Sequence, residues 1–448
     1  MNKEEKKIIV FICVLSMIVA AISVRYYLSN VNTEVTDSEN IYIKNGINGK
    51  KSIDDEASSD NDKQSEIEVP VFDSNNMHDI FGKKVNEPEL NYEFEEGVIE
   101  YYKPEEFIPK QYGEGLYADS ELEIFQDENN KYADDEKVES HRSKKIIIDT
   151  DFASDADDIL AIRLALCQQD KGLLDVIGIS LSTTYSRSPL AIYALCKYDG
   201  YGSIPVAMDT SGKGVQVHTE YVNVMYNFPK NRDDYEQPVA MYRRLLAESD
   251  TKVNIITLGF LQNIQNLMNS GPDRYSALTG TELIQQKVDT IYIVGGSDSG
   301  RPSFNFYWTG EKVINAAKTV CKGVPCRTVY ISTDLSYNTF CGEFYCREDR
   351  KEKDIVTKAL KSNKQTGGVV AWDVFSMFCA VQDINNTMQT YSLELESGNW
   401  YVSDTGATKW VQDGVPERYR IVKKLPGEEY NIYLNSILYE KFKLAQDK

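Results

Sequence analysis

The stretch that most constrains the fold of this chain is an apolar run that leads directly into a cluster of acidic residues. The run Ile146 to Ile148 is typical of a buried strand, and an apolar stripe at helical spacing begins at Ile159. Between them stand five aspartates within ten residues: Asp149, Asp151, Asp155, Asp157 and Asp158. The carboxylates are therefore expected on a strand-to-helix loop, where ligands bind in open α/β sheets.

The density of negative charge on this loop favours a metal site. Like charges repel one another, and a hard divalent cation is the simplest way to neutralise them. Carboxylate oxygens are the ligands that Ca²⁺ and Mg²⁺ prefer. The alternative is a solvated acidic turn that caps the helix and interacts favourably with its dipole.

The first 28 residues are expected to anchor the chain in a membrane. Residues 8–24 carry no charge, lysines precede them, and Arg25, Tyr26 and Tyr27 follow as an interfacial flank. A secretory apolar region is usually about 7–15 residues long and a spanning helix about 17–25. We expect an uncleaved anchor with the rest of the chain outside the cytoplasm. Cleavage near Ala21-Ile-Ser23, which would release a secreted protein, is the alternative.

Residues 29–143 form an acidic linker by composition. They are rich in Asp, Glu, Asn, Ser and Lys, and such a segment cannot bury enough apolar surface to offset its chain entropy. Up to about residue 80 we expect a disordered stalk. Aromatic residues then become frequent, so the later part is either more linker or an arm packed on the main domain. The net charge of −20 argues against a nucleic-acid partner.

Residues 144–448 have the pattern of one α/β domain. Alternating strands and helices predict βαβ units, and hence a mainly parallel sheet flanked by helices. Polar residues or glycines follow each expected strand, so they should share one active-site rim at the carboxyl edge of the sheet. Strands are expected at 146–148, 174–181, 204–207, 253–258, 290–294 and 328–332, and helices from 159 and at 189–197, 239–247, 261–268 and 311–319.

Several motifs occur in a characteristic order. They are Asp149-Thr-Asp151 with the pair Asp157-Asp158, Leu258-Gly-Phe-Leu-Gln-Asn263, Gly295-Gly296, Ser303-Phe-Asn305 and Trp372-Asp373. In order and spacing, residues 144 to about 383 resemble the nucleoside hydrolases, the Ca²⁺-dependent N-ribohydrolases of the inosine–uridine-preferring type. The resemblance implies hydrolysis of the N-glycosidic bond of a nucleoside or related N-riboside, with Ca²⁺ as cofactor. Such proteins are often dimers or tetramers, so a homo-oligomer is one expectation.

The resemblance also implies roles for single residues. Asp151 would act as the general base toward the attacking water, while Asp157 and Asn305 would hold the ribose hydroxyls. These residue types suit an oxocarbenium-like transition state, because a cation flanked by carboxylates activates water and Asn both donates and accepts hydrogen bonds. The Ca²⁺ would be held by the carboxylates of Asp151, Asp158 and Asp373 and by the backbone carbonyl of Leu258.

The aspartate loop departs from the family pattern. It is two residues longer, with Asp155 added. We adopt the register that places a gap in the loop and keeps Asp157 and Asp158 as the pair ahead of the helix. In the ungapped register Asp155 and Ala156 would take those positions, and one carboxylate would be lost.

Three further departures fall on the substrate side. Tyr185 replaces a sugar-contacting Asn of the family, Ser303 replaces a Glu, and Trp372 replaces the His that usually protonates a leaving purine. Trp cannot donate a proton as an acid, although it can stack on a base. Three alternatives remain. Another residue protonates the leaving base, the substrate has a base that departs without protonation, or the protein has lost catalysis. The rival function is therefore a surface protein that binds Ca²⁺ and a ribosyl ligand without turnover.

One histidine follows residue 143, in a loop expected after the third strand. His218 is expected either as a surface residue or as a replacement acid or substrate contact. Tyr221, Tyr226 and Phe228 after it suggest either core packing or a nucleobase pocket. Phosphatases of the haloacid-dehalogenase type also begin with an apolar strand and Asp-x-Asp, but Gly296-Ser-Asp298 matches their second acidic motif poorly. A glycosyltransferase with a metal-binding Asp-x-Asp is disfavoured as well.

Six of the eight cysteines divide into two groups. Cys167 and Cys196 lie in expected helices and are interpreted as small buried apolar residues. The other four form two C-x₄-C pairs, whose spacing is longer than that of most zinc sites. In an exported domain disulfides are favoured for these four, with open connectivity: Cys321, Cys326, Cys341 and Cys346.

Overall fold

The computed structural model describes Tyr117, Asp119, Glu121, Leu122 and residues 144–446, apart from 212, 213, 216–218, 220, 226–234, 351 and 366. The predicted anchor at 8–24, the predicted stalk up to residue 80 and His218 lie outside these residues. Within the described part of the chain, no helix has both the length and the apolar character needed to cross a bilayer.

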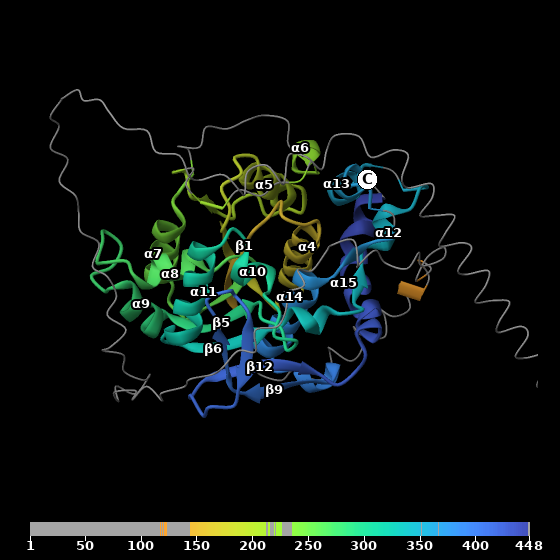
Figure 1. The fold of residues 1–448 in the computed structure, drawn as a ribbon. Helices are drawn as coiled ribbons and strands as arrows, with labels where there is room; N and C mark the ends of the chain where they lie inside the picture. Colours follow the sequence, from red (N-terminus) through yellow and green to blue (C-terminus); the bar gives the residue numbers. More distant parts are fainter. Residues whose placement is uncertain are drawn as a thin grey trace, which may run out of the picture. The chain divides into compact units, whose positions relative to one another are not determined.

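An eight-stranded sheet forms the centre of the domain (Figure 1). Neighbouring strands run parallel except for the last pair, where β9 is antiparallel to β12. The mainly parallel sheet is thus confirmed, and all six predicted strands are present. In spatial order the strands are β3 (Val206–Met208), β2 (Asp175–Leu181), β1 (Lys145–Thr150), β4 (Val253–Thr257), β5 (Val288–Val294), β6 (Arg327–Ile331), β12 (Arg418–Lys423) and β9 (Leu393–Ser397).

Helices cover both faces of the sheet, which explains the unbroken apolar run of the first strand. Ile146 and Ile148 belong to one buried cluster and Ile147 to the other, because successive side chains of a strand point to opposite faces. The helices on the first face are α4 (Asp157–Asp170), α5 (Ser188–Tyr198), α13 (Ile355–Ser362), α14 (Trp372–Ile384) and α15 (Asn431–Gln446). Those on the second are α7 (Pro238–Glu248), α8 (Gln262–Met268), α9 (Gly280–Lys287) and α11 (Glu311–Gly323).

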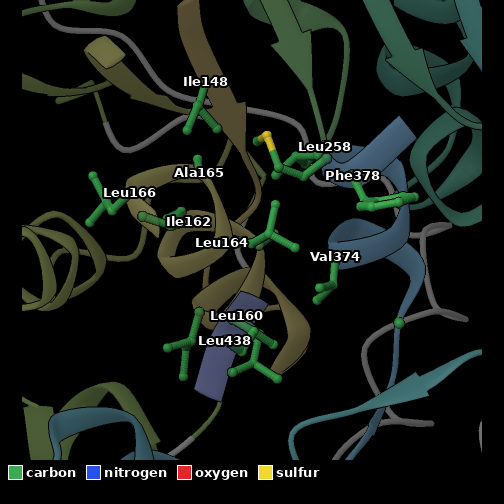
Figure 2. Close-up of a cluster of buried hydrophobic side chains, with 14 of the residues drawn as sticks. Ile148, Leu160, Ile162, Leu164, Ala165, Leu166, Leu258, Val374, Phe378 and Leu438 are labelled. Atoms are coloured by element: carbon green, nitrogen blue, oxygen red, sulfur yellow. The ribbon is translucent and has the colours of Figure 1, made fainter. Parts of the chain in front are cut away.

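Helix α4 lies at the centre of the first layer. Leu160 and Leu164 on this helix belong to the same buried cluster as Val374 and Phe378 of α14 and Leu438 of α15 (Figure 2). Most of α4 is buried, so its burial is wider than the predicted stripe. The arrangement fixes the helix whose first two residues are Asp157 and Asp158.

Arg163 on α4 is fully buried and balanced by two carboxylates. Its guanidinium lies 2.8 Å from an oxygen of Asp199 and 2.7 Å from one of Asp354. A buried charge is tolerated only with such partners, so this network ties α4 to α5 and to the start of α13.

Some described residues of the long linker pack on the domain. Leu122 is 1% exposed and belongs to the core cluster of the first face. The carboxylate of Asp119 lies 3.1 Å from Arg347 and 2.7 Å from Arg350, which follow the short helix α12 (Glu343–Cys346). These few residues therefore contact the first face of the domain and the segment after α12.

The disulfide prediction is wrong for this structure. The four cysteines concerned carry free thiols, and all four are buried in the apolar core, where thiols pack as small apolar groups. The Sγ of Cys346 lies 3.7 Å from the carbonyl oxygen of Gly342. Cys167 and Cys196 are buried as predicted.

Candidate functional site

Three carboxylates converge at the carboxyl end of β1. Asp151, Asp158 and Asp373 each offer an oxygen, and these oxygens all lie within 4.8 Å of one another. Asp151 follows β1, Asp158 lies in the first turn of α4, and Asp373 lies in the first turn of α14. All three are buried, so we call them the carboxylate triad. It contains Asp158, the second residue of the pair in the register adopted for the loop.

Hydrogen bonds around the triad hold its members in place. The hydroxyl of Thr150 donates to the carboxylate of Asp158 and accepts from the N–H of Phe152 at 3.1 Å. The carboxylate of Asp157 accepts from the backbone N–H of Asp373 at 2.7 Å. Asp157 therefore lies directly beside the triad, where it links the first turns of α4 and α14.

The electrostatics of the triad favour a cation. Burial raises the pKa of Asp158 to about 7. Burial first, and then the charge of Asp158, raises the pKa of Asp151 well above its usual range. The pKa of Asp373 rises in the same direction through burial and then the charge of Asp157. Because metal ligands must be deprotonated, a cation here would displace the protons that these raised values imply.

The donor set of the triad also fits a hard metal ion. It consists of carboxylate oxygens from three separate residues, which all lie within 4.8 Å of one another. Buried carboxylates this close repel one another when charged, and a cation between them removes the repulsion. Oxygen ligands in this number suit Ca²⁺ or Mg²⁺ with water completing the shell.

The two other aspartates of the loop have different surroundings. Asp149 accepts hydrogen bonds from the hydroxyl of Tyr242 at 2.7 Å and from Nδ2 of Asn263 at 2.9 Å, so it connects β1 to α7 and α8. Burial raises its pKa to about 7. Asp155 is half-buried, and one of its oxygens accepts from the N–H of Ala156 at 2.6 Å. Neither residue belongs to the triad.

Asn305 connects the ends of β4 and β5 to the site. It lies on the short helix α10 (Phe304–Tyr307). Its Nδ2 donates to the carbonyl of Leu258 at 2.6 Å and to that of Val294 at 3.1 Å. The carbonyl of Leu258 is thus already engaged by one partner, although its second lone pair can take another.

Two glycines permit this close assembly. A Cβ at Gly259 would lie 2.5 Å from the backbone nitrogen of Asp151. Gly296 has a φ of +86°, and a Cβ there would lie 2.6 Å from the ring of Trp400. A side chain at either position would clash with these neighbours, so Gly259 allows close approach to the backbone of Asp151 and Gly296 leaves room for the ring of Trp400.

The three residues that depart from the family pattern on the substrate side have different surroundings. Trp372 is half-buried and precedes Asp373 at the start of α14. Tyr185 is half-buried, and its hydroxyl lies 3.2 Å from Oδ1 of Asn223 on helix α6 (Tyr221–Met225). Ser303 is 4% exposed, and its hydroxyl has no hydrogen-bond partner among the described residues.

Sequence reasoning missed an aromatic group beside Asn305. Phe304 is 36% exposed; its ring stacks on Trp308 at 4.8 Å between centroids and lies 5.5 Å from the ring of Phe260. The Phe–Asn dipeptide was the available signal, because a residue next to a site residue on a short helix stays near the site. Tyr221 was interpreted as packing or as a pocket wall, and it is fully buried.

Residues 146–431, well over half of the chain, match the family model described as inosine-uridine preferring nucleoside hydrolase. The chain belongs to this family. Nucleoside hydrolases are metal-dependent hydrolases that act on N-glycosyl bonds, and the carboxylate triad is the group of described residues here that could hold the metal. The resemblance inferred from the sequence motifs is thereby confirmed.

Several solved nucleoside hydrolase structures are similar to this chain. One is the inosine-uridine preferring enzyme of Bacillus anthracis, with 14% identity, coverage of 68% of this chain and 100% of that one, and a TM-score of 0.49. An inosine-guanosine nucleoside hydrolase has 17% identity, coverage of 66% and 99%, and a TM-score of 0.49. The purine-preferring enzyme of Gardnerella vaginalis has 16% identity, coverage of 68% of this chain and 100% of that one, and a TM-score of 0.47. Comparison with proteins of curated function gave no match.

Proposed function

We propose that this domain hydrolyses the N-glycosidic bond of a nucleoside or related N-riboside, with Ca²⁺ as its cofactor. The observation that carries the proposal is the triad of three buried carboxylates within 4.8 Å of one another, in a chain of the nucleoside hydrolase family. Asp151, Asp158 and Asp373 would hold the ion together with the backbone carbonyl of Leu258. When bound, Ca²⁺ supplies the charge that orients a water molecule and makes it more acidic.

The protein's own residues would perform the remaining steps. Asp151 would take the proton of the attacking water, which a buried carboxylate beside the cation can accept. Asp157 would accept from a ribose hydroxyl with the part of its carboxylate that is not bonded to the N–H of Asp373. The Nδ2 of Asn305 is held by two backbone carbonyls, so its amide oxygen is the end that would face a second hydroxyl.

The leaving group needs a separate account, because Trp372 cannot donate a proton as an acid. Its indole would stack on the departing base and hold it against the triad. His218 would supply the proton, or the base would leave without one. Substrates whose leaving group is stable as an anion are therefore favoured.

A second candidate function is binding without turnover. It is supported by the substrate side, where Ser303 leaves a buried hydroxyl with no partner among the described residues in place of the longer carboxylate of the family pattern. Tyr185 and Trp372 also replace polar residues of that pattern. A protein with these changes would keep the metal and ribose contacts and lose the chemical step.

One experiment separates the two functions. The full chain, purified in detergent with Ca²⁺, is incubated with a panel of purine, pyrimidine and nicotinamide ribosides, and release of free base or ribose is followed. Release from at least one riboside, abolished in Asp151→Ala and retained in the exposed-site control Asp404→Ala, would support the enzyme. No turnover, together with saturable Ca²⁺-dependent ribose binding, would support the binding protein.

We also propose that residues 8–24 anchor the domain outside the cytoplasm. The support is their uncharged sequence between basic and aromatic flanks. Extraction of the protein from membranes by detergent but not by salt or alkali would support the anchor, whereas recovery of a shortened chain in the medium would support cleavage. Light scattering of the purified chain would show whether it forms a homo-oligomer.

A further inference from the structure

The lengthened aspartate loop contains a buried residue in an unusual backbone conformation. Ala153 has a φ of +86°, a conformation that costs a non-glycine residue energy unless its surroundings impose it. The residue is also fully buried, so its N–H and carbonyl need partners within the protein. The loop joins Asp151 to Asp158, and its shape therefore sets the separation of two members of the triad.

The hydroxyl of Tyr221 connects two backbone groups of the lengthened loop. The hydroxyl of Tyr221 accepts a hydrogen bond from the N–H of Ala153 at 2.8 Å and donates one to the carbonyl of Asp155 at 2.7 Å. Tyr221 is fully buried, and its ring packs edge-on against Phe152 with 5.7 Å between centroids. The hydroxyl thus satisfies two backbone groups of the loop that lie two residues apart.

A neighbour of Tyr221 supports the same residues. The hydroxyl of Thr219 donates to the carbonyl of Ala153 at 3.3 Å. Together, Thr219 and Tyr221 bond both backbone groups of Ala153. Both belong to the segment after β3, so the loop is supported from outside the βα unit that carries it.

We propose that Tyr221 is a positioning residue for the metal site. Its hydroxyl holds the lengthened loop in the one conformation that brings Asp151 and Asp158 together with Asp373. This role rests on the proposed Ca²⁺ site, although Tyr221 touches neither the ion nor the substrate. It also gives Thr219 and Tyr221 a function in a chain whose loop is longer than the family pattern.

The test is the Ca²⁺ affinity of Tyr221→Phe, which keeps the ring and removes only the hydroxyl. Calorimetric titration of the metal-stripped full chain with CaCl₂ should show affinity lower by roughly 10-fold, the size found when groups that orient metal ligands are removed. The matched control is Tyr330→Phe, because Tyr330 is also fully buried and its hydroxyl donates to Asn399 at 2.7 Å. This control should bind Ca²⁺ like the wild type.

A second pair of variants covers the case in which Tyr221→Phe does not fold. Thr219→Val should weaken Ca²⁺ binding in the same direction, whereas Thr219→Ser, which keeps the hydroxyl, should restore it. A purely structural role would lower the melting temperature of the metal-free variants and leave their Ca²⁺ affinity unchanged, and that result would overturn the inference. Absence of Ca²⁺ binding by the wild type would overturn the proposed metal site as well, so the two failures are distinguishable.

Discussion

The backbone N–H of Asp373 donates a 2.7 Å hydrogen bond to the carboxylate of Asp157, across a separation of 216 residues in the chain. A hydrogen bond from a backbone N–H stabilises the charged form of a buried carboxylate. The bond therefore joins the first turns of α4 and α14, and each of these turns also carries one member of the triad. The carboxylate triad lies where two helices begin, and this backbone contact adds to the core packing between them.

Replacement of Asp373 by Asn should have opposite effects on metal binding and on metal-free stability. Asp373→Asn keeps the backbone N–H that Asp157 needs and removes one of three crowded charges. We expect Ca²⁺ affinity to fall by at least about 10-fold, while the melting temperature of the metal-stripped protein rises. Calorimetric titration and thermal unfolding measure the two quantities. Equal affinity in the variant and the wild type would exclude Asp373 as a ligand.

The pH dependence of stability should reverse when Ca²⁺ is removed. Asp149 and Asp158 have pKa values raised to about 7 by burial, against about 4 in an unfolded chain. Between these values the folded state binds more protons, so the contribution of these carboxyls to the free energy of unfolding is present at low pH. It is lost as the pH rises through about 7.

This reversal can be isolated with one variant. In excess chelator, Asp158→Asn should be more stable than the wild type at pH 8, and the difference should shrink at pH 5. With Ca²⁺ present the wild type should gain stability as the pH rises, because protons compete with the ion for the same oxygens. A difference between variant and wild type that does not depend on pH would contradict the assignment of raised pKa values.

Trp372→His should change the leaving groups that the domain accepts. An imidazole next to Asp373 offers a group that can protonate a departing base near neutral pH. We expect a gain in the cleavage of purine ribosides and a smaller change for substrates with good leaving groups. Steady-state rates on inosine and on a p-nitrophenyl riboside make the comparison, and Trp372→Phe is the control for stacking alone. No gain with inosine would show that more than the acid is missing.

Leu122→Ala should destabilise the domain although its position lies outside the 144–448 region. Leu122 is 1% exposed within the core cluster of the first face, and removal of a buried leucine side chain usually costs about 2–5 kcal/mol. Leu444→Ala is the matched control, because Leu444 is 61% exposed, and it should change stability by less than about 0.5 kcal/mol. Urea unfolding of both variants measures the difference. Equal midpoints would mean that the arm does not contribute to stability.

The parallel core of the fold was predictable because its signals are local. Ile146 to Ile148 are buried on both faces, and such strands give unbroken apolar runs. The last third of the domain was not predicted. Its strands β9, β10 (Asn399–Val402) and β11 (Thr408–Val411) are short, and short segments give weak patterns. The alternation of Leu and Glu in β9 was nevertheless an available strand signal.

The candidate site also has a part that the sequence could predict and a part that it could not. The family resemblance could group Asp151, Asp158 and Asp373 because it relates positions distant in the chain, and the structure brings their carboxylates together. The contacts that hold them were not predicted, because neither the bond from Thr150 to Asp158 nor the one from Tyr221 to Asp155 has a periodic signal. The free thiols were missed for another reason: compartment and spacing favoured disulfides, while the local packing buries each thiol among apolar side chains.

The origin of the triad on both α4 and α14 has a kinetic consequence. Contacts between residues so distant in the chain form late in folding, because the entropy of loop closure opposes them until the intervening sheet is in place. A cation that needs all three carboxylates finds no complete site in a partly folded chain. It therefore stabilises the native state more than the transition state, so Ca²⁺ should slow unfolding strongly and leave the refolding rate nearly unchanged.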